Sequence, residues 1–149
     1  MISLFDYISR IGKSRGFGIQ SPWAYNFVRD VIFEKRPYYI YSEIDKQFSG
    51  RKERKKQKLY FRVRNFVNNK NFSVQDISDI NISDIKNISE QYNGEGVIII
   101  ENIYSSSANS DKWLQIKNSE HIGITFDLYF CSICFMPNNM YKQHYKLNF

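Results

Sequence analysis

The run Val97-Ile98-Ile99-Ile100 restricts the fold of this chain more than any other sequence feature. Four consecutive β-branched and aliphatic residues after Gly96 are typical of a strand that is buried on both faces. Strands of this kind occur in parallel sheets whose two faces are covered by other elements. The run is also far too short to span a bilayer. It therefore predicts an α/β domain rather than a helical bundle or a membrane protein.

The second half of the chain alternates between strand and helix patterns around this run. We expect strands at 72–77, 96–101, 122–130, 131–136 and 141–149, with helices near 82–92 and 110–118. This order predicts parallel strands joined by helical crossovers. We expect Pro137-Asn138-Asn139 to join the two closing strands as an antiparallel hairpin. The prediction is a sheet of four or five strands, the last one antiparallel.

The first half of the chain has helical patterns instead. A short helix is expected over 3–11, and a second begins after Ser21-Pro22, with serine as the cap, and ends at Pro37. A third, in one or two pieces, is expected over 42–68. The expected buried stripe of the second helix is Trp23, Phe27, Val28, Val31 and Ile32. We interpret 1–149 as a single domain, with an N-terminal helical segment over 1–70 and an α/β core over 71–149.

The positive charge is concentrated in one segment. The chain has 149 residues and a net charge of +6, and residues 51–70 contain nine basic side chains and one acidic one. Aromatic residues lie between these bases, a combination typical of surfaces that bind nucleic acid or another polyanion. The alternative is a solvated helix face with no ligand. The candidate polyanion-binding residues are Arg51, Lys52, Arg54, Lys55, Lys56, Lys58, Arg62 and Arg64.

Two parts of the chain resemble one protein family. Residues 15–28, Arg-Gly-Phe-Gly-Ile-Gln-Ser-Pro-Trp and onward, resemble the N-terminal segment of a group of bacterial class I methyltransferases. Residues 96–104, 113–117, 124–128 and 142–147 resemble the C-terminal third of the same proteins, including their acidic-Asn pair and their K-Q-H strand. The resemblance implies a Rossmann-like sheet, a bacterial protein, an S-adenosylmethionine cofactor and O-methyl transfer. The first residues show no basic stretch followed by a long apolar run, so the expected location is cytoplasmic.

The middle of the chain departs from that family. The family's first strand runs into a glycine-rich turn that holds the cofactor, whereas residues 72–82 contain no glycine. Only about 20 residues separate this strand from Gly96, fewer than the roughly 30 of one βαβ unit. The second, third and fourth strands are therefore expected to be missing. We expect a reduced sheet in which strand 72–77 pairs directly with strand 96–101.

This departure also predicts the function and the partners. We expect no cofactor, no catalytic residues and a non-catalytic interaction or regulatory role. The alternatives are an S-adenosylmethionine-dependent methyltransferase completed by oligomerisation, or a nucleic-acid-binding or polyanion-binding module. The lost strands would leave an exposed sheet edge, which is a liability in a soluble protein. We expect the N-terminal segment, a second copy of the chain or a protein partner to cover it.

Other residues are candidates for metal binding or redox chemistry. Glu101 and Asn102 follow the buried strand and could contribute oxygen ligands, but two ligands are too few for a tight divalent cation site. Cys131 and Cys134 have a C-x-x-C spacing that, with His121 and His144, would complete a zinc set. Residues three apart on a strand point to opposite faces, so we expect buried thiols instead. His144 is expected to be structural, and Arg15-Gly16-Phe17-Gly18 to be a turn.

Overall fold

The computed structural model describes residues 19, 21–136 and 141–149. The chain divides into two compact units, and each is described by itself. We call residues 14–69, with Phe149, the helical unit, and residues 1–13 and 70–148 the sheet unit. The expected helix over 3–11 and the turn at 15–18 lie outside the described residues. The interpretation of 1–149 as one domain stays a prediction.

The helical unit begins with α2, Pro22–Phe27, which continues as a π-helical turn, η1, Val28–Ile32. Ser21 caps α2 as predicted, because its Oγ accepts a hydrogen bond from Ala24 N at 3.3 Å. The expected buried stripe is correct at four of its five positions. Trp23 is the exception, since 36% of it is exposed. The helix also ends at Ile32, before the proline at 37.

The expected third helix forms in two pieces, α3, Ile40–Gln47, and α4, Arg51–Phe66. The break lies at 48–50, where Gly50 takes an extended conformation at the N-terminus of α4. In α4 the buried residues are Leu59, Tyr60 and Val63, all in its second half. The basic first half therefore lies outside the packed part of the helix.

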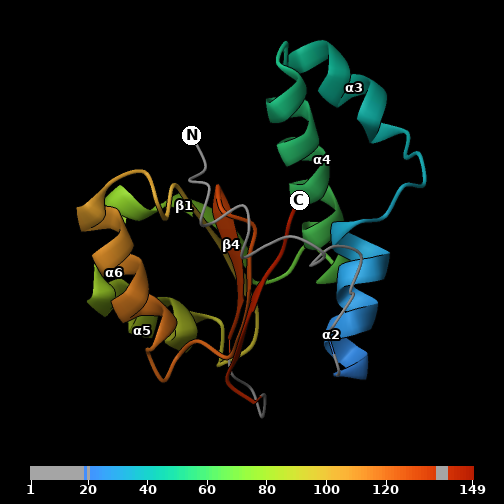
Figure 1. Cartoon of the computed structure of the whole chain (residues 1–149). Coiled ribbons are helices and arrows are strands. Elements are labelled where there is room, and N and C mark those ends of the chain that lie inside the picture. The colour runs from blue at the N-terminus through green and yellow to red at the C-terminus, as the bar shows by residue number, and fades with distance from the viewer. Residues whose placement is uncertain (1–18, 20, 137–140) are drawn as a thin grey trace. The chain divides into compact units, whose positions relative to one another are not determined.

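The sheet unit contains a mixed five-stranded sheet in the order β1-β2-β4-β3-β5 (Figure 1). Its strands are β1, Phe72–Asp76, β2, Val97–Glu101, β3, Ile124–Asp127, β4, Cys131–Phe135, and β5, Gln143–Lys146. Strands β1 and β2 are parallel neighbours, with Phe72 opposite Val97 and Asp76 opposite Glu101. The predicted direct pairing of these two strands is confirmed.

The prediction that the last strand is antiparallel was wrong. Strand β5 is parallel to β3, and the antiparallel strand is β4, which lies between β2 and β3. The hairpin forms at 128–130 because Leu128 N donates to Cys131 O at 2.8 Å and Tyr129 takes a positive φ of 76°. The expected turn at Pro137-Asn138-Asn139 lies outside the described residues.

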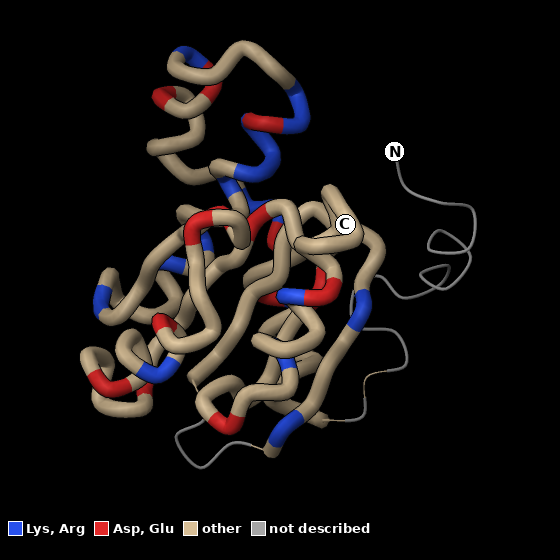
Figure 2. The backbone as a smooth tube through the Cα atoms, turned by 90° about the vertical axis from the view of Figure 1, so that its left-hand side faces the viewer, with Lys and Arg blue, Asp and Glu red and all other residues tan. Residues whose placement is uncertain are grey.

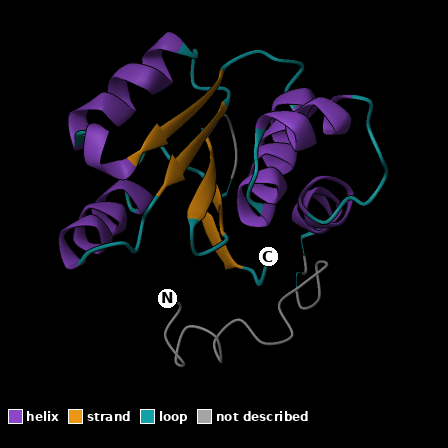
Figure 3. Ribbon diagram, turned by 90° about the horizontal axis from the view of Figure 1, so that it is seen from above, coloured by secondary structure: helices purple, strands orange, loops and turns teal. Residues whose placement is uncertain are grey.

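Helices α5, Ile82–Gln91, and α6, Ser107–Lys117, lie side by side on one face of the sheet (Figures 1 and 3). A single 3₁₀ turn, η2, Ile77–Asp79, connects β1 to α5 through Ile80 and Asn81. Under these helices lies the buried core: Ile77, Ile80, Ile85, Ile98, Ile100, Ile103, Trp113, Ile116, Ile122, Cys134 and Met136. Alternate residues of the β-branched run therefore face the helices, as expected for a strand buried on both faces.

Strands β1 and β5 form the two edges of the sheet among the described residues. Val74, in the middle of β1, is 37% exposed. The expected cover for this edge stays a prediction. Within the described ranges, none of the helices has the length and apolar character needed to cross a bilayer.

Candidate functional site

The carboxyl ends of β1, β2 and β3 lie at one edge of the sheet, where ligands of open α/β proteins usually bind. Each of these strands ends in an acidic residue: Asp76, Glu101 and Asp127. We call this set, with the neighbouring Asn102 and Tyr104, the carboxyl-edge cluster. Sequence reasoning identified only Glu101 and Asn102 in it.

Asp76 closes the turn after β1. Its Oδ1 accepts hydrogen bonds from Ser78 N at 2.9 Å and Ser78 Oγ at 2.7 Å, and its Oδ2 accepts one from Asn102 Nδ2 at 2.5 Å. These bonds to Ser78, and then the bond to Asn102, lower the pKa of the Asp76 carboxyl. Both oxygens of Asp76 therefore hold the chain in place, and the carboxylate is a weak base.

Asp127 has the corresponding position in the hairpin after β3. It is buried, its Oδ1 accepts a hydrogen bond from Tyr129 N at 2.8 Å, and its Oδ2 accepts one from the Tyr104 hydroxyl. The rings of Tyr104 and Tyr129 also pack together, with centroids 5.4 Å apart. Because Tyr129 has a positive φ, which is costly for a bulky residue, the Asp127 bond helps to hold a strained turn.

The candidate metal ligands are held by other interactions. Asn102 donates its amide to Asp76, and Glu101 is half-buried at the end of β2. Across the described residues, no group of three or more His, Cys, Asp or Glu side chains is arranged to hold a metal ion. With an amide that donates and one carboxylate, the pair lacks the oxygen donors that Mg²⁺ or Ca²⁺ requires.

The turn after β1 lacks the glycines that let a backbone approach a nucleotide cofactor closely. Instead of glycines, the turn contains Ile77 and Ile80, both fully buried in the core under α5 and α6. Their carbonyl oxygens each accept a hydrogen bond from Lys112 Nζ at 2.9 Å. The backbone of this turn is thus bound to a side chain of α6, a contact that sequence reasoning missed.

The two cysteines lie on β4, and both are buried free thiols. Cys134 faces the core under the helices, and burial raises the pKa of its thiol to about 12. Cys131 lies three residues away, so the strand alternation directs it to the opposite face. These positions agree with buried thiols rather than with a shared metal.

His144 lies on β5 and has a hydrogen bond of 2.8 Å between its Nδ1 and Thr125 Oγ1. Burial, and then the charges of Lys117 and Lys142, lower its pKa to about 4. The ring is therefore neutral near pH 7, which suits the structural role expected for it.

The candidate polyanion-binding residues lie along α4, and Figure 2 marks the Lys and Arg positions of the backbone in blue. Five of them have contacts within the helical unit. Arg54 Nε donates to Phe48 O at 2.5 Å, Lys56 pairs with Glu53 at 2.9 Å, and Lys58 pairs with Asp45 at 2.7 Å. Arg62 binds η1 and α3, and Lys55 Nζ lies 4.1 Å from the centroid of the Phe149 ring. The exposed bases are Arg51, Lys52, Lys55 and Arg64.

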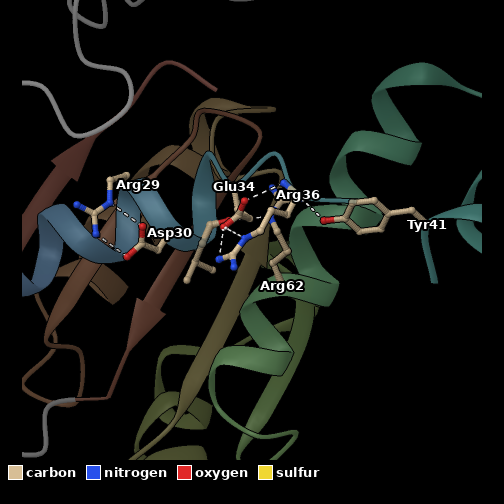
Figure 4. A network of polar contacts seen from close by, with 7 residues as sticks. Arg29, Asp30, Glu34, Arg36, Tyr41 and Arg62 are labelled. Carbon is tan, nitrogen blue, oxygen red and sulfur yellow. Dashed lines mark hydrogen bonds and ion pairs between the residues drawn. The ribbon is translucent and has the colours of Figure 1, made fainter. Parts of the chain in front are cut away.

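Arg62 has the most contacts with other elements. Its Nε donates to Val31 O at 2.6 Å, its Nη2 to Ile32 O at 2.9 Å and its Nη1 to Tyr41 Oη at 3.0 Å. Figure 4 shows the guanidinium between these elements and its bond to Tyr41. The two carbonyls belong to the last residues of η1, which have no partner within their own helix. Arg62 therefore joins η1, α3 and α4.

Comparisons with family models, curated proteins and solved structures find no match to this chain.

Proposed function

We propose that this chain is a non-catalytic interaction protein built on a reduced, methyltransferase-like sheet, and that it does not bind S-adenosylmethionine. The observation that carries the proposal is the turn after β1. In place of a glycine loop, it contains two buried isoleucines whose carbonyls bind Lys112. Cofactor binding at this turn would require the core under α5 and α6 to open.

The carboxyl-edge cluster supports the same proposal. A general base needs an oxygen within reach of the substrate and a pKa near the working pH. Asp76 and Asp127 instead use both of their oxygens to close turns, and the pKa of Asp76 is lowered. Neither residue matches the requirements of an acid–base catalyst.

Calorimetric titration of the full chain with S-adenosylmethionine tests the proposal. Adenosine, which carries the same base without the methionine, is titrated in parallel. We expect S-adenosylmethionine to bind no more tightly than adenosine at any protein concentration that remains soluble. A micromolar Kd for S-adenosylmethionine at all concentrations, well below the Kd of adenosine, would overturn the proposal. Binding that appears only at concentrations where light scattering detects an oligomer would also overturn it, and would favour the enzyme completed by oligomerisation.

We propose that the β1 edge is the surface on which a second copy of the chain binds. Val74 is 37% exposed on this edge, and strand edges pair readily with other strands. Light scattering should give the mass of a dimer for the native chain and of a monomer for Val74→Lys. Leu114→Lys on α6, 52% exposed, is the control and should remain dimeric. A native chain that is monomeric throughout would contradict this assignment.

A second candidate function, polyanion binding, is favoured by the exposed bases of α4. The Lys55 ammonium lies 4.1 Å from the centroid of the Phe149 ring, and burial, and then the charges of Arg51 and Arg62, lower its pKa. Arg51, Lys52 and Lys55 lie in the first two turns of the helix and are exposed. A single-stranded oligonucleotide could neutralise all three.

Fluorescence anisotropy with a labelled single-stranded oligonucleotide tests this candidate. If three phosphates are neutralised, the affinity should fall about tenfold for a threefold rise in salt. The triple change of Arg51, Lys52 and Lys55 to Glu should abolish binding. The control changes Lys86, Lys117 and Lys146 of the sheet unit to Glu, which alters the net charge equally and should preserve most of the binding affinity. An affinity independent of salt would reject the candidate.

A further inference from the structure

The helical unit contains a pocket of about 300 Å³, at the lower end of the size range of small-molecule sites. The pocket lies between α2, η1 and α4, with Tyr38 from the segment that precedes α3. Its lining combines aromatic rings with polar side chains: Trp23, Asn26, Phe27, Asp30, Val31, Tyr38, Arg62, Asn65 and Phe66. Every one of these residues belongs to the helical unit.

Three rings form an aromatic wall in this pocket. Trp23 and Phe27 are stacked with centroids 5.7 Å apart and planes 2° apart, and Phe66 meets Phe27 edge-on at 5.0 Å. Phe27 is buried, but Trp23 and Phe66 are 36% and 43% exposed. Exposing two large rings in one concave site sacrifices apolar burial, which a flat ligand would restore by stacking on them.

The polar groups of the pocket define what that ligand is. Asp30 already accepts two hydrogen bonds from Arg29, at 2.6 and 2.8 Å, and Arg62 is bound to η1 and Tyr41 (Figure 4). Asp30 is therefore paired with Arg29, and the donors that Arg62 uses in these bonds are not available to a ligand. Asn26 and Asn65 differ, because neither side-chain amide has a hydrogen-bond partner within the described residues. Each amide offers both donors and an acceptor.

We propose that this pocket binds the base of a nucleoside or nucleotide. A nucleobase is a flat, uncharged ring with donors and acceptors on its edge, so it can stack on aromatic side chains while amides bind its edge. A plain hydrocarbon ring would use the aromatic wall but not Asn26 and Asn65. S-adenosylmethionine carries an adenosine group and could enter this pocket, so only an affinity beyond that of adenosine counts against the proposed function. The inference does not depend on the charged first half of α4.

Tryptophan fluorescence of the full chain provides the test. The chain has two tryptophans, and Trp113 is 2% exposed in the sheet unit, so a ligand in the pocket changes chiefly the emission of Trp23. Adenosine, guanosine, cytidine and uridine are titrated separately, together with benzyl alcohol as a ring without base edges. At least one nucleoside should give saturable quenching, more tightly than benzyl alcohol.

Three variants locate the binding. Asn65→Ala removes one amide and should weaken binding about three- to tenfold, the effect of one lost hydrogen bond. Phe66→Ala removes a stacking surface and should weaken it about tenfold or more. Tyr39→Ala removes a ring that is 99% exposed and does not line the pocket, and should leave the affinity unchanged. Circular dichroism establishes that each variant is folded.

Two outcomes would overturn the proposal. One is the absence of saturable quenching by any nucleoside up to its solubility limit. The other is binding that is equally strong for benzyl alcohol, or equally strong in folded Asn65→Ala, because the amides would then not contribute. Uncharged nucleosides carry no phosphate, so a failure here is independent of the salt-dependent oligonucleotide test.

Discussion

Replacing Arg62 by Met should destabilise the helical unit, although α4 is otherwise rich in exposed bases. The substitution keeps an apolar side chain of similar length and removes the three hydrogen bonds to Val31 O, Ile32 O and Tyr41 Oη. Val31 and Ile32 are 7% and 0% exposed, so their carbonyl groups lie in a buried part of the unit. Removing the hydrogen-bond donor of these two carbonyl groups is therefore expected to lower the free energy of unfolding.

The magnitude follows from these contacts. A buried polar group that loses its partner costs about 1–3 kcal/mol. Arg62 is half-buried, so water can enter after the substitution, and the lower end of that range applies to each of the three acceptors. We expect the free energy of unfolding to fall by about 2–3 kcal/mol. For a chain of this length, that loss lowers Tm by about 5–10 °C.

Urea unfolding followed by far-UV circular dichroism measures this loss. Arg51→Met is the matched control, because Arg51 is an exposed base at the N-terminus of the same helix, where the helix dipole disfavours positive charge. Its stability should remain within about 0.5 kcal/mol of the native chain. Arg62→Lys keeps the charge but not the planar set of donors, so its loss of stability should lie between those of Arg51→Met and Arg62→Met. Equal stabilities for the three variants would refute the reasoning.

Three further outcomes follow from single residues. His144 has a pKa of about 4 in the folded chain, so the unfolded chain takes up a proton first as the pH falls. The free energy of unfolding should therefore decrease between about pH 6.5 and pH 4, and solvent screening limits the loss to about 1 kcal/mol. In urea titrations at several pH values, His144→Asn should flatten this dependence. Gly96→Ala would place a Cβ 2.6 Å from Asn71 O at a φ of +147°, so we expect thermal unfolding to show a stability loss of about 2–4 kcal/mol. Gly94→Ala, whose added Cβ would meet open space, should lose less stability. The Cys134 thiol, with a pKa of about 12, should resist iodoacetamide at pH 8 until urea unfolds the chain, and rapid alkylation of the native protein would contradict its burial.

The elements whose signals are local could be predicted from the sequence. The β-branched run gave β2 its position, and the short spacing to Gly96 predicted that β1 would be its parallel neighbour. The hairpin could not be placed, because residues 128–130 are Leu, Tyr and Phe and contain none of the usual turn residues. Asp127 and a positive φ at Tyr129 make the turn there, and neither is evident from an apolar stretch.

The candidate site was predicted less well, because its contacts join residues far apart in the chain. Asp76 and Asn102 are 26 positions apart, and Tyr104 and Asp127 are 23. The basic segment was visible as composition, but composition does not separate Arg62 from Arg51. The position of Arg62 within the apolar second half of α4, between Phe61 and Val63, is the one signal that could have indicated an inward contact.

The side chains of the carboxyl-edge cluster hold the ends of β1 and β3 to the turns that follow them. In a larger open sheet, neighbouring strands and loops support the ends of the central strands, and acidic residues there remain available to a ligand. Here β1 is an edge strand, and Asp76 binds both the turn that follows it and Asn102 at the end of β2. Asn102 itself has a φ of +62°, so the second strand also ends in a conformation that a side-chain bond must hold. A carboxylate that fixes two strand ends cannot move toward a substrate without loosening both. The bonds of Asp76 therefore support the proposal made above of a non-catalytic role, because they join the end of β1 to the end of β2.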